Sequence, residues 1–266
     1  MINIPLNQIR GLPRRIKSRF NIPVLLYDID VPTSLPSGGG FTFNHYLGAD
    51  LTEFDSFIIP SEGSIATLKE LGANNVDVLH FGVDPEVYRL NSSFPKEYDL
   101  FFYGMGGRAR EKNVRSMLTE PSKQISARFL ISGSDFGFDV GNSTVIPLLS
   151  FNQWRVYCAK SKINLNVVRD LHAHVYATST SRPFELAAMR CCIVSSPYLG
   201  LDKWFDIGKE IVITNSSKEA IEIYQELLHN PERREKMSTL AYERVIKEHT
   251  ARHRAAEMVN IIEKFQ

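Results

Sequence analysis

Two stretches of this sequence carry residue types suited to binding a phosphate, and the first is the turn Gly104-Met105-Gly106-Gly107-Arg108. It follows an apolar run typical of a strand and precedes a segment typical of a helix. Glycines at such a turn let a phosphate approach the backbone, and the first turn of the helix favours an anion. Arg110 adds positive charge at the same end. The residues predicted to bind here are Gly106, Gly107, Arg108 and Lys112.

The same turn allows two other interpretations. Its spacing, Gly104-x-Gly106-x-x-Ala109, matches the relaxed dinucleotide-binding fingerprint, and Asp135 would then be the acid that binds the ribose. A tight turn between strand and helix also needs glycine for steric reasons, with no ligand involved. The motif alone does not decide among the three interpretations.

The second stretch joins a predicted strand to the start of a helix. Lys162 and Asn164 lie on the strand Ser161 to Asn166, and Arg182-Pro183-Phe184-Glu185 opens the helix. The helix amides and Arg182 would meet phosphate, and Glu185 would accept hydrogen bonds from ribose hydroxyls. Alternatively, a carboxylate on a first helical turn only complements the helix dipole. The combination of cation, carboxylate and exposed amides favours a nucleotide sugar as the ligand.

Asp28 and Asp30 are the candidates for a catalytic base. They follow the apolar run Ile22 to Tyr27, and the carboxyl end of a parallel strand faces the crevice where ligands bind. Either carboxylate could take the proton from an acceptor hydroxyl. The alternative is that they cap the loop that continues through Pro32.

Other reactive side chains indicate no further site. His172 and His174 alternate on a predicted strand and would face one way, but no third ligand follows at metal spacing, so we assign no metal. Cys191 and Cys192 begin an apolar strand, which is typical of core thiols. The sequence contains neither a Ser-His-Asp elbow nor a Walker loop.

Strands alternate with helices along the chain, which predicts parallel sheets in two α/β domains. The first series has strands at 22–27, 56–59 and 76–80 and a helix at 64–71. The second has strands at 98–103, 128–132, 161–166, 191–195 and 210–214 and helices at 151–159, 184–189, 217–229, 231–248 and 251–265. We predict two Rossmann-like doubly wound domains, 1–88 and 89–266, the first one reduced. The last helix is a candidate to pack back on the first domain.

Composition excludes several classes of protein. The chain has 266 residues, 43% of them hydrophobic, and a net charge of +1, which argues for a globular fold and against bulk binding of nucleic acid. No apolar run approaches the roughly 18 residues of a membrane helix. The N-terminus lacks the apolar core of a signal peptide. Three cysteines, two of them adjacent, make a poor disulfide framework, so we expect a reduced, cytoplasmic protein.

One local cluster is basic. Residues 9–20 hold five cations, Arg10, Arg14, Arg15, Lys17 and Arg19, interleaved with apolar side chains. The segment is interpreted either as a solvated helix face or as a weak contact with a membrane surface. Pro13 is expected to interrupt the helix, which favours the solvated face.

Three segments resemble the C-terminal half of GT-B glycosyltransferases: Ser161 to Asn166, Arg182 to Ala188, and Trp204 to Val212. The closest type is the spore-maturation-protein (CgeB-like) group, within a family 4-like set. His80 to Pro85 resembles the interdomain segment of that fold, and the chain from His229 onward resembles its closing helices. The resemblance runs from about Ile22 to the end and implies the GT-B arrangement of two Rossmann-like domains.

The resemblance also implies roles for individual positions. Glu185 matches the second glutamate of the Glu-x7-Glu pattern, which binds the ribose, and the first would fall at Ala177. The turn at Gly106 matches the loop near the donor diphosphate, and Arg182 would contact phosphate or sugar. Arg190 stands where glycine is usual. Only about 20 residues precede the first strand, which implies an abbreviated acceptor domain.

The sequence therefore predicts a glycosyltransferase that moves a sugar from a nucleotide-activated donor to a hydroxyl on a glycan, lipid or protein. Positive charge and amide dipoles would stabilise the diphosphate leaving group without a metal or another cofactor. One alternative is a non-catalytic module that binds sugar nucleotide or glycan together with a partner chain. A dinucleotide-dependent oxidoreductase is the third interpretation. The predicted donor-binding residues are Gly106, Gly107, Arg108, Lys112, Lys162, Asn164, Arg182, Pro183, Phe184 and Glu185.

Overall fold

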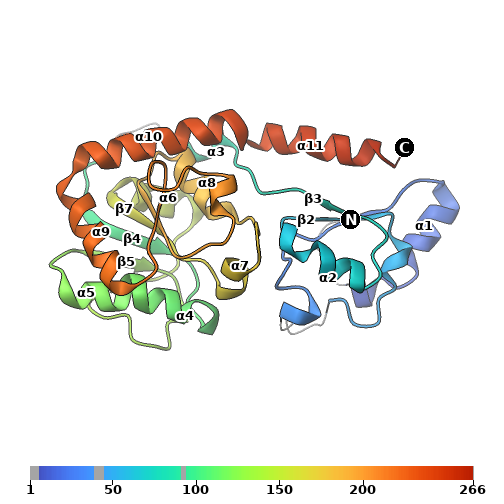
Figure 1. Ribbon diagram of the computed structural model, residues 1–266, viewed down its shortest axis with the longest axis horizontal. Helices are drawn as coiled ribbons and strands as arrows, with labels where there is room; N and C mark the ends of the chain where they lie inside the picture. Colours follow the sequence, from blue (N-terminus) through green and yellow to red (C-terminus); the bar gives the residue numbers. More distant parts are fainter. Residues whose placement is uncertain (1–5, 39–44, 91–93, 266) are drawn as a thin grey trace. The chain divides into compact units, whose positions relative to one another are not determined.

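The computed structural model describes residues 6–38, 45–90 and 94–265, and Figure 1 shows their helices and strands. The chain is divided into two compact units. Unit 1 comprises Met1–Phe81, His174–Thr180 and Ala251–Gln266. Unit 2 comprises Gly82–Ala173 and Ser181–Thr250. Each unit contains a sheet of parallel strands, so the predicted α/β class is confirmed.

Unit 1 is built on a three-stranded sheet in the order β1-β2-β3. Its strands are β1 (Leu25–Tyr27), β2 (Ser56–Ile59) and β3 (Val76–Val78). All four residues of β2 are buried, as expected for a central strand covered on both faces. Its helices are α1 (Leu12–Phe20), α2 (Ile65–Glu70) and α11 (Ala251–Glu263), with 3-10 turns at Leu6–Gln8, Pro36–Gly38, Leu51–Glu53 and Glu62–Ser64.

The prediction that Pro13 interrupts the first helix is wrong. Pro13 lies in the first turn of α1, where a backbone amide would have no acceptor within the helix. Proline therefore removes no helical hydrogen bond at this position. Two of the basic side chains pair with carboxylates of the same unit: Arg14 with Glu53 at 3.1 Å and Lys17 with Asp55 at 2.8 Å. These pairs attach one side of α1 to the segment of unit 1 that contains Glu53 and Asp55. A membrane contact through residues 9–20 stays a prediction.

Two later segments of the chain return to unit 1. In the first, the Ser179 amide donates to the Pro60 carbonyl at 2.8 Å, and the Gly63 amide donates to the Tyr176 carbonyl at 2.9 Å. The second is α11, whose Ile261 packs in one apolar cluster with Ile58 and Leu79. Residues far away in sequence thus bond to the segment after β2 and pack against the sheet of unit 1.

Unit 2 holds a six-stranded sheet in the order β6-β5-β4-β7-β8-β9. Its strands are β4 (Tyr98–Tyr103), β5 (Phe129–Ser132), β6 (Thr144–Ile146), β7 (Ser161–Asn166), β8 (Ile193–Ser195) and β9 (Val212–Ile213). Its helices are α3 (Pro85–Tyr88), α4 (Arg108–Val114), a π-helical turn (Arg115–Thr119), α5 (Glu120–Gln124), α6 (Phe151–Ala159), α7 (Asp170–His174), α8 (Ser181–Ala188), α9 (Ser217–His229) and α10 (Pro231–Glu248), with a 3-10 turn at Leu201–Lys203.

Both faces of this sheet are covered, and β4 shows how. Leu100 and Phe102 point into the main apolar cluster, together with Tyr224 of α9. The alternate residues Phe101 and Tyr103 pack on the other face, where Tyr103 stacks on Trp154 of α6 with 4.2 Å between ring centroids. Alternate side chains of a strand face opposite sides, so the apolar run from Leu100 to Tyr103 requires helices on both. Figure 1 shows the helices around this sheet.

The segment that holds His172 and His174 is the helix α7, so the prediction of a strand there is wrong. Two residues that are two positions apart point in different directions on a helix, and the two imidazoles therefore do not share a face. Among the described residues, no helix is long and apolar enough to cross a membrane.

Candidate functional site

The carboxyl ends of β4 and β7, which are neighbours in the sheet, form the base of the candidate site in unit 2. After β4 the chain turns through Gly104 into α4, and after β7 it continues through Val167 towards α7. α8 begins at Ser181 and brings Arg182 and Glu185 to the same place. Ligands in parallel α/β sheets bind at this edge.

Arg182 is fixed over the end of β4. One terminal nitrogen of its guanidinium donates to the carbonyl of Tyr103, and the guanidinium carbon lies 3.8 Å from the centroid of the Tyr103 ring. The Nε of Arg182 is buried and has no hydrogen-bond partner. A buried donor without an acceptor costs free energy, so this N–H is available for an acceptor that the chain does not supply.

Arg110 reaches the same edge of the sheet, and Arg169 follows β7 by three residues. Arg110 of α4 donates to the carbonyls of Val167 at 3.0 Å and Met105 at 2.9 Å. Burial lowers the pKa of Arg110, and the positive charges of Arg182 and Arg169 lower it further. Arg110 thus lies in the field of two other positive charges, and an anion bound beside it would relieve that repulsion.

Glu185 receives hydrogen bonds from two tyrosines. The hydroxyls of Tyr88 and Tyr103 donate to its two carboxylate oxygens, each at 3.0 Å. Burial raises the pKa of both tyrosines, and the negative charge of Glu185 contributes to the rise. A carboxylate can accept about four hydrogen bonds. Glu185 therefore retains capacity for ligand hydroxyls while the tyrosines fix its orientation.

The glycine turn is explained largely by packing. The amides of Gly106 and Gly107 donate to the carbonyls of Ser134 at 2.8 Å and Asp135 at 2.7 Å. Both amides are therefore already bonded to the loop that follows β5. A Cβ on Gly106 would lie 2.4 Å from the Asp135 carbonyl oxygen, and Gly107 has φ +72°. The steric interpretation accounts for both glycines. Asp135 belongs to this packing, since its carboxylate lies against Gly107.

The remaining cations of α4 differ from Arg110 in exposure. Arg108 and Lys112 are exposed, whereas Arg110 is half-buried at the carboxyl ends of β4 and β7. Positions 108 and 112 share one face of a helix and position 110 lies on another, which explains the difference. A contact of Arg108 or Lys112 with the donor stays a prediction.

The structure does not bring Lys162 and Asn164 to Arg182. Lys162 is the second residue of β7, at its amino end, and pairs with Asp99 at 2.7 Å. Asn164 is 1% exposed, and its side-chain amide donates to the carbonyl of Cys158 at 3.2 Å. Four residues of strand, about 13 Å, separate Lys162 from the carboxyl end of β7.

Pro183 and Phe184 also have packing roles. Both are buried in α8. The Phe184 ring lies 5.6 Å from the ring of Phe205 and 5.3 Å from that of His249. Phe184 anchors the first turn of α8, and through it positions Arg182 and Glu185.

Asp28 and Asp30 lie in unit 1. Asp28 is 3% exposed, and its carboxylate accepts hydrogen bonds from the Ser34 hydroxyl at 2.6 Å, the Tyr46 hydroxyl at 2.8 Å and the Asp30 amide at 3.0 Å. This geometry is that of a loop cap, the alternative that the sequence allowed. Asp30 is half-buried. Gly39 and Gly40 of the adjoining glycine-rich loop lie outside the described residues.

No group of three or more His, Cys, Asp or Glu side chains in the described part of the chain could hold a metal ion. The core position predicted for Cys191 and Cys192 is confirmed, since each is 4% exposed. Cys158 is also buried, and all three are free thiols.

Sequence reasoning missed Arg169 and Tyr88 as site residues. Arg169 follows β7 by three residues, so a cation just past a strand's carboxyl end was a usable signal. Tyr88 reaches Glu185 from 97 positions away, and no local pattern reports such a contact.

Comparisons with known proteins agree with this geometry. A family model described as "Glycosyl transferase-like" matches residues 110–260. None of the curated proteins searched matches the chain.

Three solved structures illustrate the likeness of fold. Sucrose-phosphate synthase from Thermosynechococcus elongatus is 15% identical, with a TM-score of 0.67 over 94% of this chain and 70% of that one. The Anabaena protein Alr3699/HepE, in complex with UDP-glucose, is 11% identical, with a TM-score of 0.67 over 98% and 84%. The β-glucosyltransferase of phage T4 is 15% identical, with a TM-score of 0.62 over 91% and 74%. These structures share the GT-B fold predicted for this chain.

Proposed function

Because the chain belongs to the glycosyl transferase-like family whose model matches residues 110–260, we propose that it transfers a sugar from a nucleotide-activated donor to an acceptor hydroxyl. The observation that carries the proposal is that Arg182, Glu185 and Arg110 meet the carboxyl ends of β4 and β7 in unit 2: Arg182 and Glu185 both bond to Tyr103, and Arg110 bonds to the Val167 carbonyl. A nucleoside diphosphate offers two anionic phosphates and a ribose with two hydroxyls. These residues offer a matched set of cations and a carboxylate.

Leaving-group stabilisation is the main task of these residues. When the bond between sugar and diphosphate breaks, negative charge develops on the diphosphate. Guanidinium groups already held near that position stabilise the charge without having to reorganise. The Nε of Arg182, which has no partner within the chain, would donate to the diphosphate, and Arg110 is held in place by two backbone carbonyls. The chain's own cations would supply the positive charge, and we propose that the reaction needs no metal.

Glu185 is proposed to bind the ribose. Its oxygens are oriented by Tyr88 and Tyr103, and the Tyr103 ring is in turn stacked on Trp154. A carboxylate whose position is fixed by packing loses little entropy when it accepts hydrogen bonds from the ribose hydroxyls. The HepE structure bound to UDP-glucose gives a precedent for such a donor on this fold.

Assignment to the CgeB-like group is proposed on the sequence pattern. Ala177 replaces the first glutamate of the Glu-x7-Glu pattern, and it is fully buried with φ +46°. That position therefore has no side chain with which to bind the donor sugar. Recognition of the sugar would depend on other residues than in transferases that keep both glutamates.

Asp30 is the better candidate for the base. Three donors surround the carboxylate of Asp28, which leaves it little capacity to accept a proton from a substrate. The same observation favours a second candidate function, a non-catalytic module that binds the sugar nucleotide. The two functions differ in turnover and share the donor site.

A thermal-shift panel tests the donor site, and a product assay tests the chemistry. UDP, GDP, CDP, NAD and NADP are added separately, and one nucleoside diphosphate is expected to raise the melting temperature, since a ligand that binds only the folded state stabilises it. NAD and NADP are expected to leave it unchanged. Release of the nucleoside diphosphate from its sugar conjugates then separates the transferase from the binding module. Stabilisation by NAD alone would refute both.

A further inference from the structure

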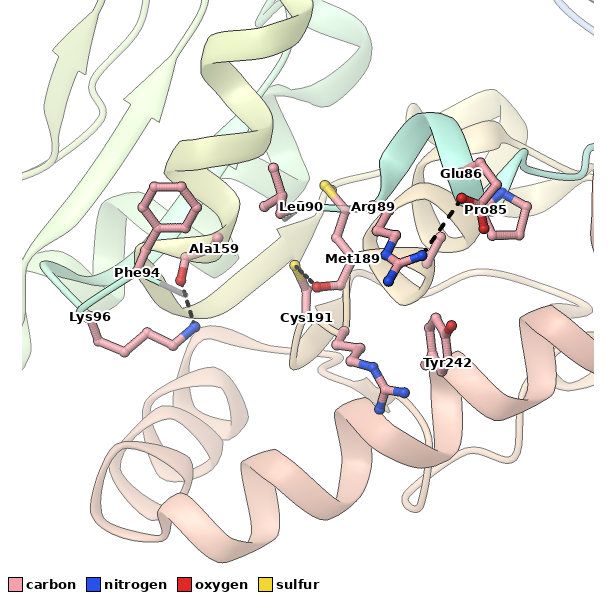
Figure 2. A pocket seen from close by; sticks show the side chains of 12 residues that line it. Pro85, Glu86, Arg89, Leu90, Phe94, Lys96, Ala159, Met189, Cys191 and Tyr242 are labelled. Carbon is pink, nitrogen blue, oxygen red and sulfur yellow. Dashed lines mark hydrogen bonds and ion pairs between the residues drawn. The ribbon is translucent and has the colours of Figure 1, made fainter. Parts of the chain in front are cut away.

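A cavity of 520 Å³ lies in unit 2 at the amino-terminal edge of the six-stranded sheet (Figure 2). Lys96 precedes β4, Ala159 precedes β7 and Cys191 precedes β8, and all three line it. The donor site proposed above lies at the opposite, carboxyl edge. The cavity is therefore separate from it, and its volume falls within the range typical of sites for small ligands.

The charged side chains of the lining are mostly cationic. They are Arg89, Lys96 and Arg190, with Glu86 as the single acid. Figure 2 labels Glu86 and Arg89, which are close in sequence, and Lys96, which lies on another segment. Lys96 is anchored by hydrogen bonds to the carbonyls of Ala159 at 2.7 Å and Ser161 at 2.9 Å, which leave one of its three ammonium protons to donate. Arg89 pairs only loosely with Glu86, at 3.8 Å.

Arg190 occupies a backbone position that favours glycine. It follows the end of α8 with φ +54°. Its amide donates to the carbonyl of Ala187 at 3.0 Å, and the next amide, of Cys191, donates to Leu186 at 3.0 Å. These two bonds define a Schellman motif in which the left-handed residue is usually glycine. Arginine here strains the backbone, and such strain is characteristic of residues with a functional role.

The strained position places a guanidinium at the cavity. The guanidinium carbon of Arg190 lies 3.8 Å from the centroid of the Tyr242 ring, and Tyr242 of α10 is itself part of the lining. Stacking on an aromatic ring fixes the plane of the guanidinium and leaves its N–H groups at the edge. Arg190 is thus held ready to bind an oxyanion.

We propose that this cavity binds a small organic phosphomonoester. The lining carries a surplus of two positive charges, which matches a phosphomonoester that approaches two negative charges at neutral pH. Leu90 and Phe94 supply apolar surface for an organic group beside the phosphate. The inference does not depend on sugar transfer, because neither the residues nor the probe belong to the donor site.

Isothermal titration with phenyl phosphate tests the proposal, with inorganic phosphate as the comparison. The wild-type chain is expected to bind phenyl phosphate more tightly than inorganic phosphate, since only the former fills the apolar part. Arg190→Gly is the principal variant, because glycine relaxes the backbone while it removes the guanidinium. It is expected to weaken phenyl phosphate binding about tenfold or more, the effect of losing a charge-assisted hydrogen bond. Arg190→Lys is expected to recover part of the affinity.

Two control variants locate the ligand. Arg128→Ala removes an exposed arginine of the same unit, and Arg182→Ala removes a cation of the donor site; both are expected to bind phenyl phosphate as the wild type does. Arg190→Gly is expected to bind nucleoside diphosphate normally. The proposal is overturned if the wild type does not bind phenyl phosphate, if Arg190→Gly binds it unchanged, or if Arg182→Ala weakens it as much as Arg190→Gly does.

Discussion

Replacing Arg182 with alanine should weaken binding of a nucleoside diphosphate much more than binding of the matching monophosphate. Arg182 is held at the end of β4 by its bond to the Tyr103 carbonyl and by stacking on the Tyr103 ring. Its Nε is buried and lacks a partner. If that N–H meets the distal phosphate, only a ligand that has a distal phosphate loses the interaction.

The magnitude follows from the kind of bond that is lost. A hydrogen bond to a charged group contributes about 2 kcal/mol, which corresponds to about a 30-fold change in the dissociation constant. The monophosphate should lose less than about threefold, because the proximal phosphate keeps Arg110 as a partner. Loss of the cation–π contact with Tyr103 costs stability of about 0.5–1 kcal/mol, and relief of repulsion with Arg110 offsets part of it.

Isothermal titration of both nucleotides against wild type, Arg182→Ala and Arg182→Lys measures these changes. The nucleobase is the one that the thermal-shift panel selects. Lysine keeps the charge and loses the planar fork, so an intermediate loss is expected. Arg128→Ala serves as the matched control, since Arg128 is exposed and the variant removes only its 4.0 Å ion pair with Asp99. Equal losses for diphosphate and monophosphate in a folded variant would place Arg182 away from the distal phosphate.

Three further predictions concern Glu185, the two aspartates and Tyr103. Glu185→Gln should weaken diphosphate and monophosphate alike, by about tenfold, because both carry the ribose; unchanged affinity in titrations would remove Glu185 from the site. Asp30→Asn should lower turnover and leave nucleotide affinity unchanged, whereas Asp28→Asn should lower the free energy of unfolding by about 1–3 kcal/mol, since it disturbs buried hydrogen bonds; loss of turnover without loss of stability in Asp28→Asn would reverse these roles. Burial raises the pKa of Tyr103, so the folded chain holds this proton when the unfolded chain has lost it, and stability should fall as pH rises above about 10. Melting temperatures between pH 8 and 11 should fall less steeply in Tyr103→Phe, and parallel curves would contradict the assignment.

The sheet of unit 2 was predictable where its strands are buried on both faces. β4 and β7 have the bounds that the sequence predicts: β4 holds the apolar run Leu100 to Tyr103, and β7 alternates Ile163 and Leu165 with polar residues. β6 was missed since it has three residues, two of them exposed, and so lacks an apolar run. α7 was interpreted as a strand because His172-Ala173-His174 alternates like one, although the fold makes it one turn of helix.

The site was predictable in part for a different reason. Arg182 and Glu185 stand at a helix start beside a strand end, and both are local signals. The choice of Arg110 over Arg108 depends on the rotation of α4 about its axis, which packing against the carboxyl ends of β4 and β7 sets. Lys162 is the second residue of β7 and so lies at its amino end, where it pairs with Asp99, whereas the site lies at the carboxyl end.

α8 connects the two cationic features of unit 2, and the energetics at its ends differ. Arg182 at its amino end faces the positive end of the helix dipole, so it gains nothing from the helix and needs an anion. Arg190, just past the carboxyl end, faces the negative end, which stabilises a cation by about 0.3–1 kcal/mol. Stacking on Tyr242 adds about 0.5–1 kcal/mol. Together these offset the roughly 1–2 kcal/mol cost of a left-handed arginine.

The stability of Arg190→Gly should therefore stay close to that of the wild type, because glycine removes the strain and the two compensating interactions together. Thermal unfolding of the variant checks this balance directly. A nearly unchanged melting temperature makes any loss of phenyl phosphate binding a property of the cavity. A large fall in the melting temperature would instead show that Arg190 is kept for its contribution to the end of α8.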